Sequence, residues 1–535
     1  MRAIGAVRLP DVVVAGIAGV ALMLLVGGLA GQDYNWDLLN YHYASVQLLL
    51  SGRYDLNIAP SQVQSWFNPI AYIPAYLAIT YLPPWVASAL FAIVGGLNAP
   101  LIYLIADRIG GDLPERVRVR SGFVCVAIGM SGAVLFSEAG TTFLDDMLSI
   151  PILATVLATI SGMRAADPTR RACCFAIAGL LMGAACGLKL TNLVMAVGMA
   201  GAITVLVLAR RVSLFSWLAF ALGGLVGFLL TGGWWALRMW ETFGNPVFPM
   251  FNGLFQSRFA PPRSQIDTTF LPSDWAALFT FPWHWLVGDA MPGIEIAVVD
   301  RRYGVALIAS AVIGLVVLAR RGRIDRRHDE ALLIALFCLL TYAVWLFSFA
   351  ILRYVLVFEM LSGVILLAAL SLLPTNRVRH VPTIMILAAF AMTLGTRYGN
   401  WGRAPFSDDW FDVRGVEQVV RPGTTYILPG AAPLGFLIHI FPADARFIGI
   451  GGTFPLTPDD VLGARTVQMI RAAPHLRSLA AAPTDPASIA ALHRFGLTII
   501  QNSCRVIRTK RADVESCALS REAGRAYGRN SKVSL

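Results

Sequence analysis

The 535-residue chain has few charged residues and none of the motifs that mark common soluble enzymes. Only 14% of its residues are Asp, Glu, Lys or Arg, whereas 56% are apolar. It has no His and Cys cluster with zinc-ligand spacing, no P-loop, no dinucleotide fingerprint and no serine elbow. It also has no internal repeat or low-complexity tract. The composition therefore excludes a soluble enzyme, a disordered adaptor and a collagen-like or coiled-coil protein, and nucleotide-dependent chemistry has no support.

The apolar residues instead form long runs, and each run is long enough to cross a bilayer. About 20 apolar residues in a helix span a hydrocarbon core of roughly 30 Å. The runs predict an all-α polytopic membrane domain of about 11 transmembrane helices within residues 1–396. The predicted spans lie near residues 12–30, 85–106, 121–137, 147–163, 172–188, 192–209, 214–233, 303–319, 331–350, 355–373 and 382–396.

Basic residues between the predicted spans indicate the orientation of the chain. Loops rich in Lys and Arg face the cytoplasm, so the net charge of +11 is a topology signal and not a sign of nucleic-acid binding. The intervening segments 32–84 and 138–146 contain no Lys or Arg except Arg53. We expect a multi-pass protein of the cytoplasmic membrane, with its N-terminus inside on an uncleaved first span and its C-terminus outside. The basic residues expected inside are Arg2, Arg8, Arg108, Arg116, Arg118, Arg120, Arg164, Arg170, Arg171, Arg210, Arg211, Arg320, Arg321, Arg323, Arg326, Arg327, Arg377 and Arg379.

Three segments are expected on the outer side. Residues 31–84 form a long loop that prolines interrupt, and its apolar pieces are typical of interfacial helices. Residues 234–302 form a second long loop, whose many aromatic residues favour the lipid headgroup region. Residues 397–535 have the composition of a soluble domain. The Trp residues placed in the second loop are Trp234, Trp235, Trp275, Trp283 and Trp285.

The tail at 397–535 is predicted to be a small extracytoplasmic α/β domain. Residues 425–428, 446–450 and 497–501 resemble strands. Helices are expected to begin at 457–460 and 485–486, where a capping residue precedes proline, and Gly496 is expected to end the second helix. Cys504 and Cys517 are the only cysteines of the tail. In an oxidising compartment they either pair or remain free thiols.

Acidic residues gather on the predicted outer side of the membrane. Asp33 and Asp37 follow the first span directly, and Glu138, Asp145 and Asp146 follow the third. Ionisable groups beside a membrane are expensive and mark functional sites more often than chance. Two outer loops thus deliver carboxylates to one interface, unless outer loops simply tolerate acids because only basic residues are disfavoured there.

These features resemble the GT-C superfamily of integral-membrane glycosyltransferases, which includes protein O-mannosyltransferases and the aminoarabinose transferase of lipid A. Members are similar to this chain along nearly its whole length, with a catalytic Asp in a long first outer loop and often an outer soluble domain. The chain departs from these relatives at Leu38, where they place Glu after the Asp, so Asp33 and Asp37 both remain candidates. The local signatures are Asp37-x-x-x-Tyr41, Gly187-Leu188-Lys189-Leu190-Thr191, Gly244-Asn245-Pro246-Val247-Phe248-Pro249 and Arg353-Tyr354.

The resemblance implies transfer of a sugar, with inversion, from a polyprenyl-phosphate donor to an acceptor lipid, glycan or protein. A carboxylate must activate the acceptor, and cations must stabilise the departing phosphate. Asp37 is the first choice for the base. The remaining acids, Asp33, Glu138, Asp145 and Asp146, are candidates for acceptor orientation, sugar contacts or the binding of a divalent cation.

Lys189 and Arg353 are the preferred phosphate ligands, because both lie at outer span ends that hold little other positive charge; Arg238 is a third candidate. The alternative is that these long side chains only extend to the lipid headgroups. Candidate sugar or acceptor contacts are Tyr41, His42, His284 and Tyr354.

Two other functions are compatible with many spans. A transporter or flippase of lipid-linked sugars would need them too, but such proteins place coupling charges at mid-membrane and often show paired repeats. A non-catalytic assembly subunit could use the outer domain as a docking surface.

Overall fold

A computed structural model describes residues 8–287, 291–320, 326–372 and 375–522 of the chain. Within the predicted inner clusters, Arg2, Arg321 and Arg323 lie outside the described residues. The chain forms two compact units. The first, here called the membrane unit, comprises residues 1–33, 85–234 and 266–404. The second comprises residues 34–84, 235–265 and 405–535, and is here called the outer unit after the side of the membrane on which the sequence predicts it.

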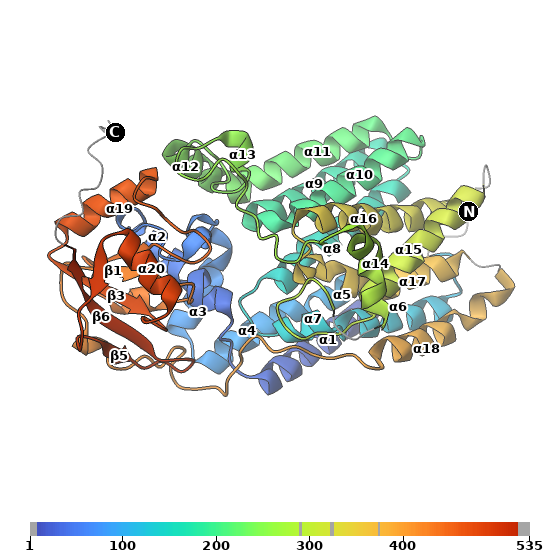
Figure 1. Cartoon of the computed structure of the whole chain (residues 1–535). Coiled ribbons are helices and arrows are strands. Elements are labelled where there is room, and N and C mark those ends of the chain that lie inside the picture. The colour runs from blue at the N-terminus through green and yellow to red at the C-terminus, as the bar shows by residue number, and fades with distance from the viewer. Residues whose placement is uncertain (1–7, 288–290, 321–325, 373–374, 523–535) are drawn as a thin grey trace. The chain divides into compact units, whose positions relative to one another are not determined.

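The membrane unit is a bundle of long apolar helices. Figure 1 shows α9, α10, α11 and α16 running alongside one another, and α9 packs most extensively on α11 and α8. Its helices are α1 (Leu9–Ala30), α4 (Pro84–Gly96), α5 (Asn98–Ile109), α6 (Glu115–Met130), α7 (Ala133–Glu138), α8 (Asp145–Arg164), α9 (Pro168–Leu188), α10 (Leu193–Leu208), α11 (Leu214–Phe228), α14 (Trp275–Val287), α15 (Arg302–Ala319), α16 (Arg326–Ser348), α17 (Leu356–Ser371) and α18 (Val381–Thr393).

Nine helical stretches among the described residues are long and apolar enough to cross a membrane, which confirms the polytopic helical class. They coincide with nine of the eleven predicted spans. The other two predictions, 121–137 and 382–396, fall on shorter helices. The first is divided between α6 and α7 by a break at Ser131 and Gly132, and the second is α18, of 13 residues.

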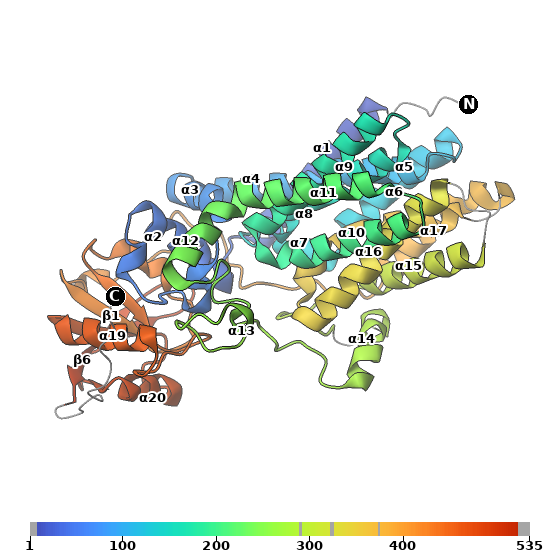
Figure 2. The same cartoon turned by 90° about the horizontal axis from the view of Figure 1, so that it is seen from above.

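The helix of the preceding span continues past residue 234, where the second loop was predicted to begin. It runs through a π-helical turn at Leu229–Gly233 into α12 (Trp234–Phe243). Further along, α14 packs against α15 (Figure 2). Its Trp275 and Trp283 are exposed as a headgroup role requires, whereas Trp285 is fully buried against Tyr303, Tyr342 and Trp345.

The outer unit is built on a mixed six-stranded sheet with the order β2-β1-β3-β6-β4, and β5 pairs with β6. Strand β1 pairs in parallel with both β2 and β3, whereas β6 is antiparallel to its partners. The strands are β1 (Thr424–Leu428), β2 (Arg446–Gly449), β3 (His475–Ala480), β4 (Leu497–Ile499), β5 (Arg505–Ile507) and β6 (Val514–Arg521), and the helices are α2 (Tyr43–Leu50), α3 (Ile73–Tyr81), α12, α13 (Asn252–Phe255), α19 (Val461–Ala472) and α20 (Pro486–Arg494).

The predicted first loop is part of the outer unit and packs on its sheet. Ile58 forms a parallel bridge to Ile448 of β2, which extends the sheet by one residue pair. The Asn57 side chain accepts a hydrogen bond from the Phe447 amide at 2.7 Å. Trp66 packs edge-on against Phe454, with ring centroids 4.7 Å apart. The sheet core therefore depends on chain segments that are far apart in sequence.

The predicted α/β class of the tail is confirmed. The three predicted strands correspond to β1, β2 and β4, while β3, β5 and β6 were not predicted. Asp485 caps α20 as expected, since its carboxylate accepts the Ser488 amide. The helix expected at 457–460 begins later, at Val461, because the Asp460 carboxylate binds the Thr457 amide and hydroxyl in a preceding turn. Cys504 and Cys517 form a disulfide.

Loss of this disulfide is expected to destabilise the outer unit by about 3 kcal/mol, because a cross-link over a loop of similar length removes roughly that much chain entropy from the unfolded state. The two cysteines are 13 residues apart in sequence. The double variant Cys504→Ala, Cys517→Ala should lower the urea midpoint of the outer unit. Limited proteolysis of the full chain in detergent measures this midpoint. Cys173→Ala, at an exposed free thiol, is the control and should leave the midpoint unchanged.

Candidate active site

Three carboxylates of the membrane unit come together where α7 meets α8. Asp33, Glu138 and Asp146 are each fully buried. Asp33 accepts hydrogen bonds from the Thr142 amide at 3.0 Å and from the Thr142 hydroxyl at 3.1 Å. The Asp146 amide donates to Glu138 Oε2 at 3.3 Å. The residue that follows the first span and the two acids of the second acidic loop therefore share one location.

A tight turn produces this arrangement. Helix α7 ends at Glu138, Gly140 adopts φ +72°, Leu144 adopts φ +69°, and α8 begins at Asp145. Both positive φ values reverse the chain within a few residues, and at Gly140 the missing side chain removes the usual steric cost. Asp145 and Asp146 occupy the first turn of α8, where the helix dipole favours negative charge.

Some oxygens of these acids have no protein partner. Glu138 Oε1 and both carboxylate oxygens of Asp146 accept no hydrogen bond from the described residues. Burial raises the pKa of Glu138 well above its ordinary value, and the charges of Asp145 and Asp146 add to the increase. A buried carboxylate with an open oxygen and a raised pKa is suited to accept a proton near neutral pH.

Arg403 supplies positive charge to this acidic group. Its guanidinium donates to the carbonyls of Gly31 at 3.0 Å, Ser137 at 2.9 Å and Ala139 at 2.6 Å. Burial lowers the pKa of Arg403, whereas the charges of the three nearby acids, Asp33, Asp146 and Glu138, act to raise it. Arg403 falls in the tail that the sequence predicts to be a soluble domain, and no local motif marks its role here.

A second polar group in the membrane unit pairs Asp145 with two cations. Lys189 Nζ lies 2.6 Å from Asp145 Oδ1, and Arg353 lies 3.4 Å from Asp145 Oδ2. Arg353 also lies 3.5 Å from Glu295, whose side chain is 33% exposed. The two predicted phosphate ligands are thus brought together by one carboxylate, and their heads point into protein and not toward lipid headgroups.

Aromatic rings surround these two cations. The Arg353 guanidinium lies 4.9 Å from the Phe143 ring centre and 4.7 Å from that of Tyr354, and Lys189 lies 5.2 Å from the Tyr354 ring centre. The face of an aromatic ring attracts a cation electrostatically, so these rings help to hold the two cationic side chains in place. Tyr354, a predicted sugar or acceptor contact, therefore lies beside the predicted phosphate ligands.

The remaining predicted site residues lie elsewhere. His284 is exposed on α14 of the membrane unit. Four other predicted site residues belong to the outer unit: Asp37, Tyr41, His42 and Arg238. Their roles remain predictions.

Within the outer unit, His42 stacks on the Tyr72 ring at 4.1 Å and meets the Tyr41 ring edge-on at 4.5 Å. Arg238 forms a salt bridge with exposed Asp55 at 3.0 Å and lies over the Tyr54 ring. Asp37 is buried just before the helical turn that starts at Leu38.

The helical membrane bundle, the buried acids where α7 meets α8 and the small α/β domain match the architecture that the sequence resemblance implied, and the fold is similar to that of a solved structure. A crystal structure of ArnT from Cupriavidus metallidurans bound to undecaprenyl phosphate is similar to the chain with a TM-score of 0.50 and 15% identity, covering 95% of this chain and 98% of that chain.

The apo crystal structure of the same ArnT gives a TM-score of 0.49 and 16% identity, covering 94% of this chain and 97% of that chain. No family model matches the chain, and a search of curated proteins gave no significant match. The similarity concerns the fold alone.

Proposed function

We propose that the chain is an integral-membrane glycosyltransferase that moves a hexose or pentose, with inversion, from a polyprenyl-phosphate donor to a lipid, glycan or protein on the outer side of the cytoplasmic membrane. The observation that carries the proposal is the presence, in one unit, of open buried carboxylates beside a Lys and Arg pair. The ArnT of the same fold binds undecaprenyl phosphate, which supports a polyprenyl-phosphate donor.

Lys189 and Arg353 are suited to bind the donor phosphate. Both cations are nearly buried, and in the free protein they share the single carboxylate of Asp145, while Arg353 also pairs with Glu295. A phosphate competes for the same charges, and its own charge increases as the bond to the anomeric carbon breaks. Cations fixed in a site of low dielectric stabilise such a developing charge strongly, which lowers the barrier.

A carboxylate then removes the proton of the acceptor. The acceptor oxygen or nitrogen attacks the anomeric carbon, the bond from that carbon to the phosphate oxygen breaks, and polyprenyl phosphate leaves with the electron pair. Within the membrane unit, Asp146 is the best candidate for this base, because no side chain among the described residues donates to its oxygens, whereas Asp33 already accepts two bonds from Thr142. Asp37 of the outer unit remains the alternative.

The other candidates have supporting roles in this proposal. Glu138 offers a hard oxygen ligand of the kind that a divalent cation prefers, although Arg403 already supplies positive charge there. We propose that Tyr354 contacts the sugar of a donor held by Arg353, because its ring centre lies 4.7 Å from the Arg353 guanidinium. Sugar or acceptor contacts are also proposed for Tyr41, His42 and His284, and a further phosphate contact for Arg238.

The test is transfer of a labelled sugar from a purified polyprenyl-phosphate donor in proteoliposomes, with and without a chelator. Asp146→Asn, Asp33→Asn and Asp37→Asn should identify the base as the variant with the largest loss of turnover. Asp167→Asn, which keeps the cap of α9, is the control and should remain active. Labelled donor that crosses the membrane without forming a new glycosidic bond would contradict the proposal and indicate a transporter.

A further inference from the structure

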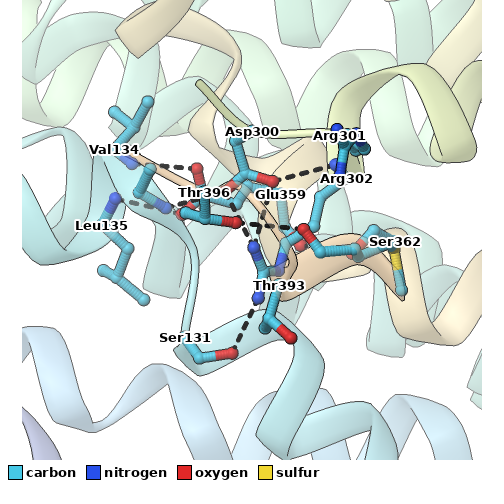
Figure 3. Close-up of polar contacts among 12 residues, drawn as sticks. Ser131, Val134, Leu135, Asp300, Arg301, Arg302, Glu359, Ser362, Thr393 and Thr396 are labelled. Carbon is cyan, nitrogen blue, oxygen red and sulfur yellow. Dashed lines mark hydrogen bonds and ion pairs between the residues drawn. The ribbon is translucent and has the colours of Figure 1, made fainter. Parts of the chain in front are cut away.

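A second group of buried charges lies in the membrane unit, outside the acids described above. Asp300, Arg302 and Glu359 are each fully buried (Figure 3). Asp300 lies just before α15, Arg302 is the first residue of α15, and Glu359 lies in the first turn of α17. No sequence motif singles out these three residues. Buried ions in a membrane protein are costly, so their presence needs a reason.

The two carboxylates hold the start of α7. Asp300 Oδ2 accepts the Ala133 amide at 2.7 Å. Glu359 Oε2 accepts the Val134 amide at 3.1 Å, and its Oε1 accepts the Leu135 amide at 3.0 Å (Figure 3). Three of the four amides that a helix start leaves without intrahelical partners are thereby satisfied by two side chains from other elements.

Arg302 connects the Asp300 carboxylate to the end of α6. It binds both oxygens of Asp300 at 3.0 and 2.9 Å, and it donates to the Ile128 carbonyl and to the Ser131 hydroxyl, each at 2.9 Å. At Gly132 any Cβ would overlap the Glu359 carboxylate, so only glycine allows this approach. The group therefore determines where α6 stops and in which direction α7 leaves.

Helix α7 is short enough to transmit this constraint. Its six residues span about 9 Å at the usual rise per residue. Glu138, one of the open buried acids, is its last residue, so the start of the helix is held by Asp300 and Glu359 while its end carries a proposed site group. Well-packed apolar residues often stabilise a protein as much as a buried ion group does, which makes stability alone a weak reason for the group.

We propose that Asp300, Arg302 and Glu359 are positioning residues that hold α7 so that Glu138 meets the first turn of α8. This inference rests on the proposed glycosyltransferase function. The three residues do not touch the reacting atoms in this proposal; they act through α7. Because displacement of a site group by about 1 Å can reduce turnover by about 100-fold, loosening α7 should affect chemistry more than donor binding.

The pH dependence of turnover gives a readout that general destabilisation would not produce. Burial holds the pKa of Glu138 high, and a loosened α7 admits water, which lets this pKa fall toward its ordinary value. The acidic limb of the pH profile should then move to lower pH. The charged and titratable groups that act with Glu138 are Asp33, Asp145, Asp146, Lys189, Tyr303, Arg353 and Arg403.

The decisive comparison is between Glu359→Gln and Glu330→Gln. Glu330 is equally buried in the same unit, where it binds Arg164 at 2.6 Å, and it has no hydrogen bond to α7 among those the structure describes. Both variants should lower the melting temperature. Only Glu359→Gln should reduce kcat by about 10- to 100-fold with little change in donor KM, and only it should shift the acidic limb.

Two further measurements keep the test decisive if Glu359→Gln fails to fold. Ser131→Ala, which removes one bond of Arg302, should give a smaller shift of the same kind, and Glu359→Asp, which keeps the charge, should restore part of the activity. Hydrogen exchange of residues 133–138 should increase in Glu359→Gln and not in Glu330→Gln. Equal hydrogen exchange and equal pH profiles in Glu359→Gln and Glu330→Gln would overturn the positioning role. If exchange at residues 133–138 increases only in Glu359→Gln but the wild type transfers no sugar, the result counts against the transferase function alone.

Discussion

Replacing Lys189 by methionine is expected to reduce turnover of a polyprenyl-phosphate sugar by about 10²- to 10³-fold, the effect of removing one charged hydrogen-bond donor from a developing anion. Methionine keeps most of the apolar stem and removes only the ammonium group. In the free protein that group lies 2.6 Å from Asp145 and is 9% exposed. Turnover at saturating donor, measured in proteoliposomes, is the relevant quantity.

The matched variant Lys189→Arg keeps the charge and should retain much more activity than Lys189→Met. If the ammonium binds the donor phosphate, Asp145→Asn should weaken turnover less than Lys189→Met, because it removes the competitor of the phosphate and leaves both cations in place. Wild-type turnover in Lys189→Met would show that this lysine serves only the ion pair with Asp145.

Replacing Arg403 by methionine is expected to destabilise the membrane unit by about 3–5 kcal/mol at neutral pH, because it leaves buried acids without their cation. It also leaves the carbonyls of Gly31, Ser137 and Ala139 without their donor. The loss should appear as a lower melting temperature in detergent. Arg379→Met, at an exposed arginine, is the control and should change stability by no more than about 0.5 kcal/mol.

This loss of stability should become smaller as the pH falls. The pKa of Glu138 is raised in the folded protein, so the folded state takes up a proton at a higher pH than the unfolded chain does. Stability therefore increases as the pH is lowered from the folded pKa of Glu138 toward the ordinary carboxyl value, and the need for Arg403 decreases over the same range. A constant difference between the two melting curves at every pH would contradict this link.

The spans could be predicted from the sequence because a bilayer demands a continuous apolar helix of a certain length. The errors fall where a local feature competes with that demand. At Ser131 and Gly132 a break needed by Glu359 divides an apolar run, and this need is invisible without Glu359 itself. In the tail, β3 was missed because Arg477 interrupts its apolar pattern, and that arginine is accommodated by hydrogen bonds to Ser516 of β6.

The acidic part of the site was predictable because its members gather in two short sequence stretches. Arg403 and the second charged group were harder to find, because their partners are distant in sequence. Arg403 binds Ser137, 266 residues earlier, and Glu359 binds Val134, 225 residues earlier. No local spacing rule links such positions, so Arg403 and the group around Arg302 emerge only from the folded chain.

The bridge from Ile58 to Ile448 has a consequence for how the outer unit is made and isolated. A fragment that starts at residue 405 would lack the stretch that covers this edge of β2, and would expose unpaired backbone together with the apolar surface under Trp66. Such a fragment should aggregate unless residues 34–84 and 235–265 are supplied with it. During synthesis, residues 34–84 stay incompletely packed until the strands after residue 405 have been translated. The outer unit therefore completes its fold after the helices between these segments have been made.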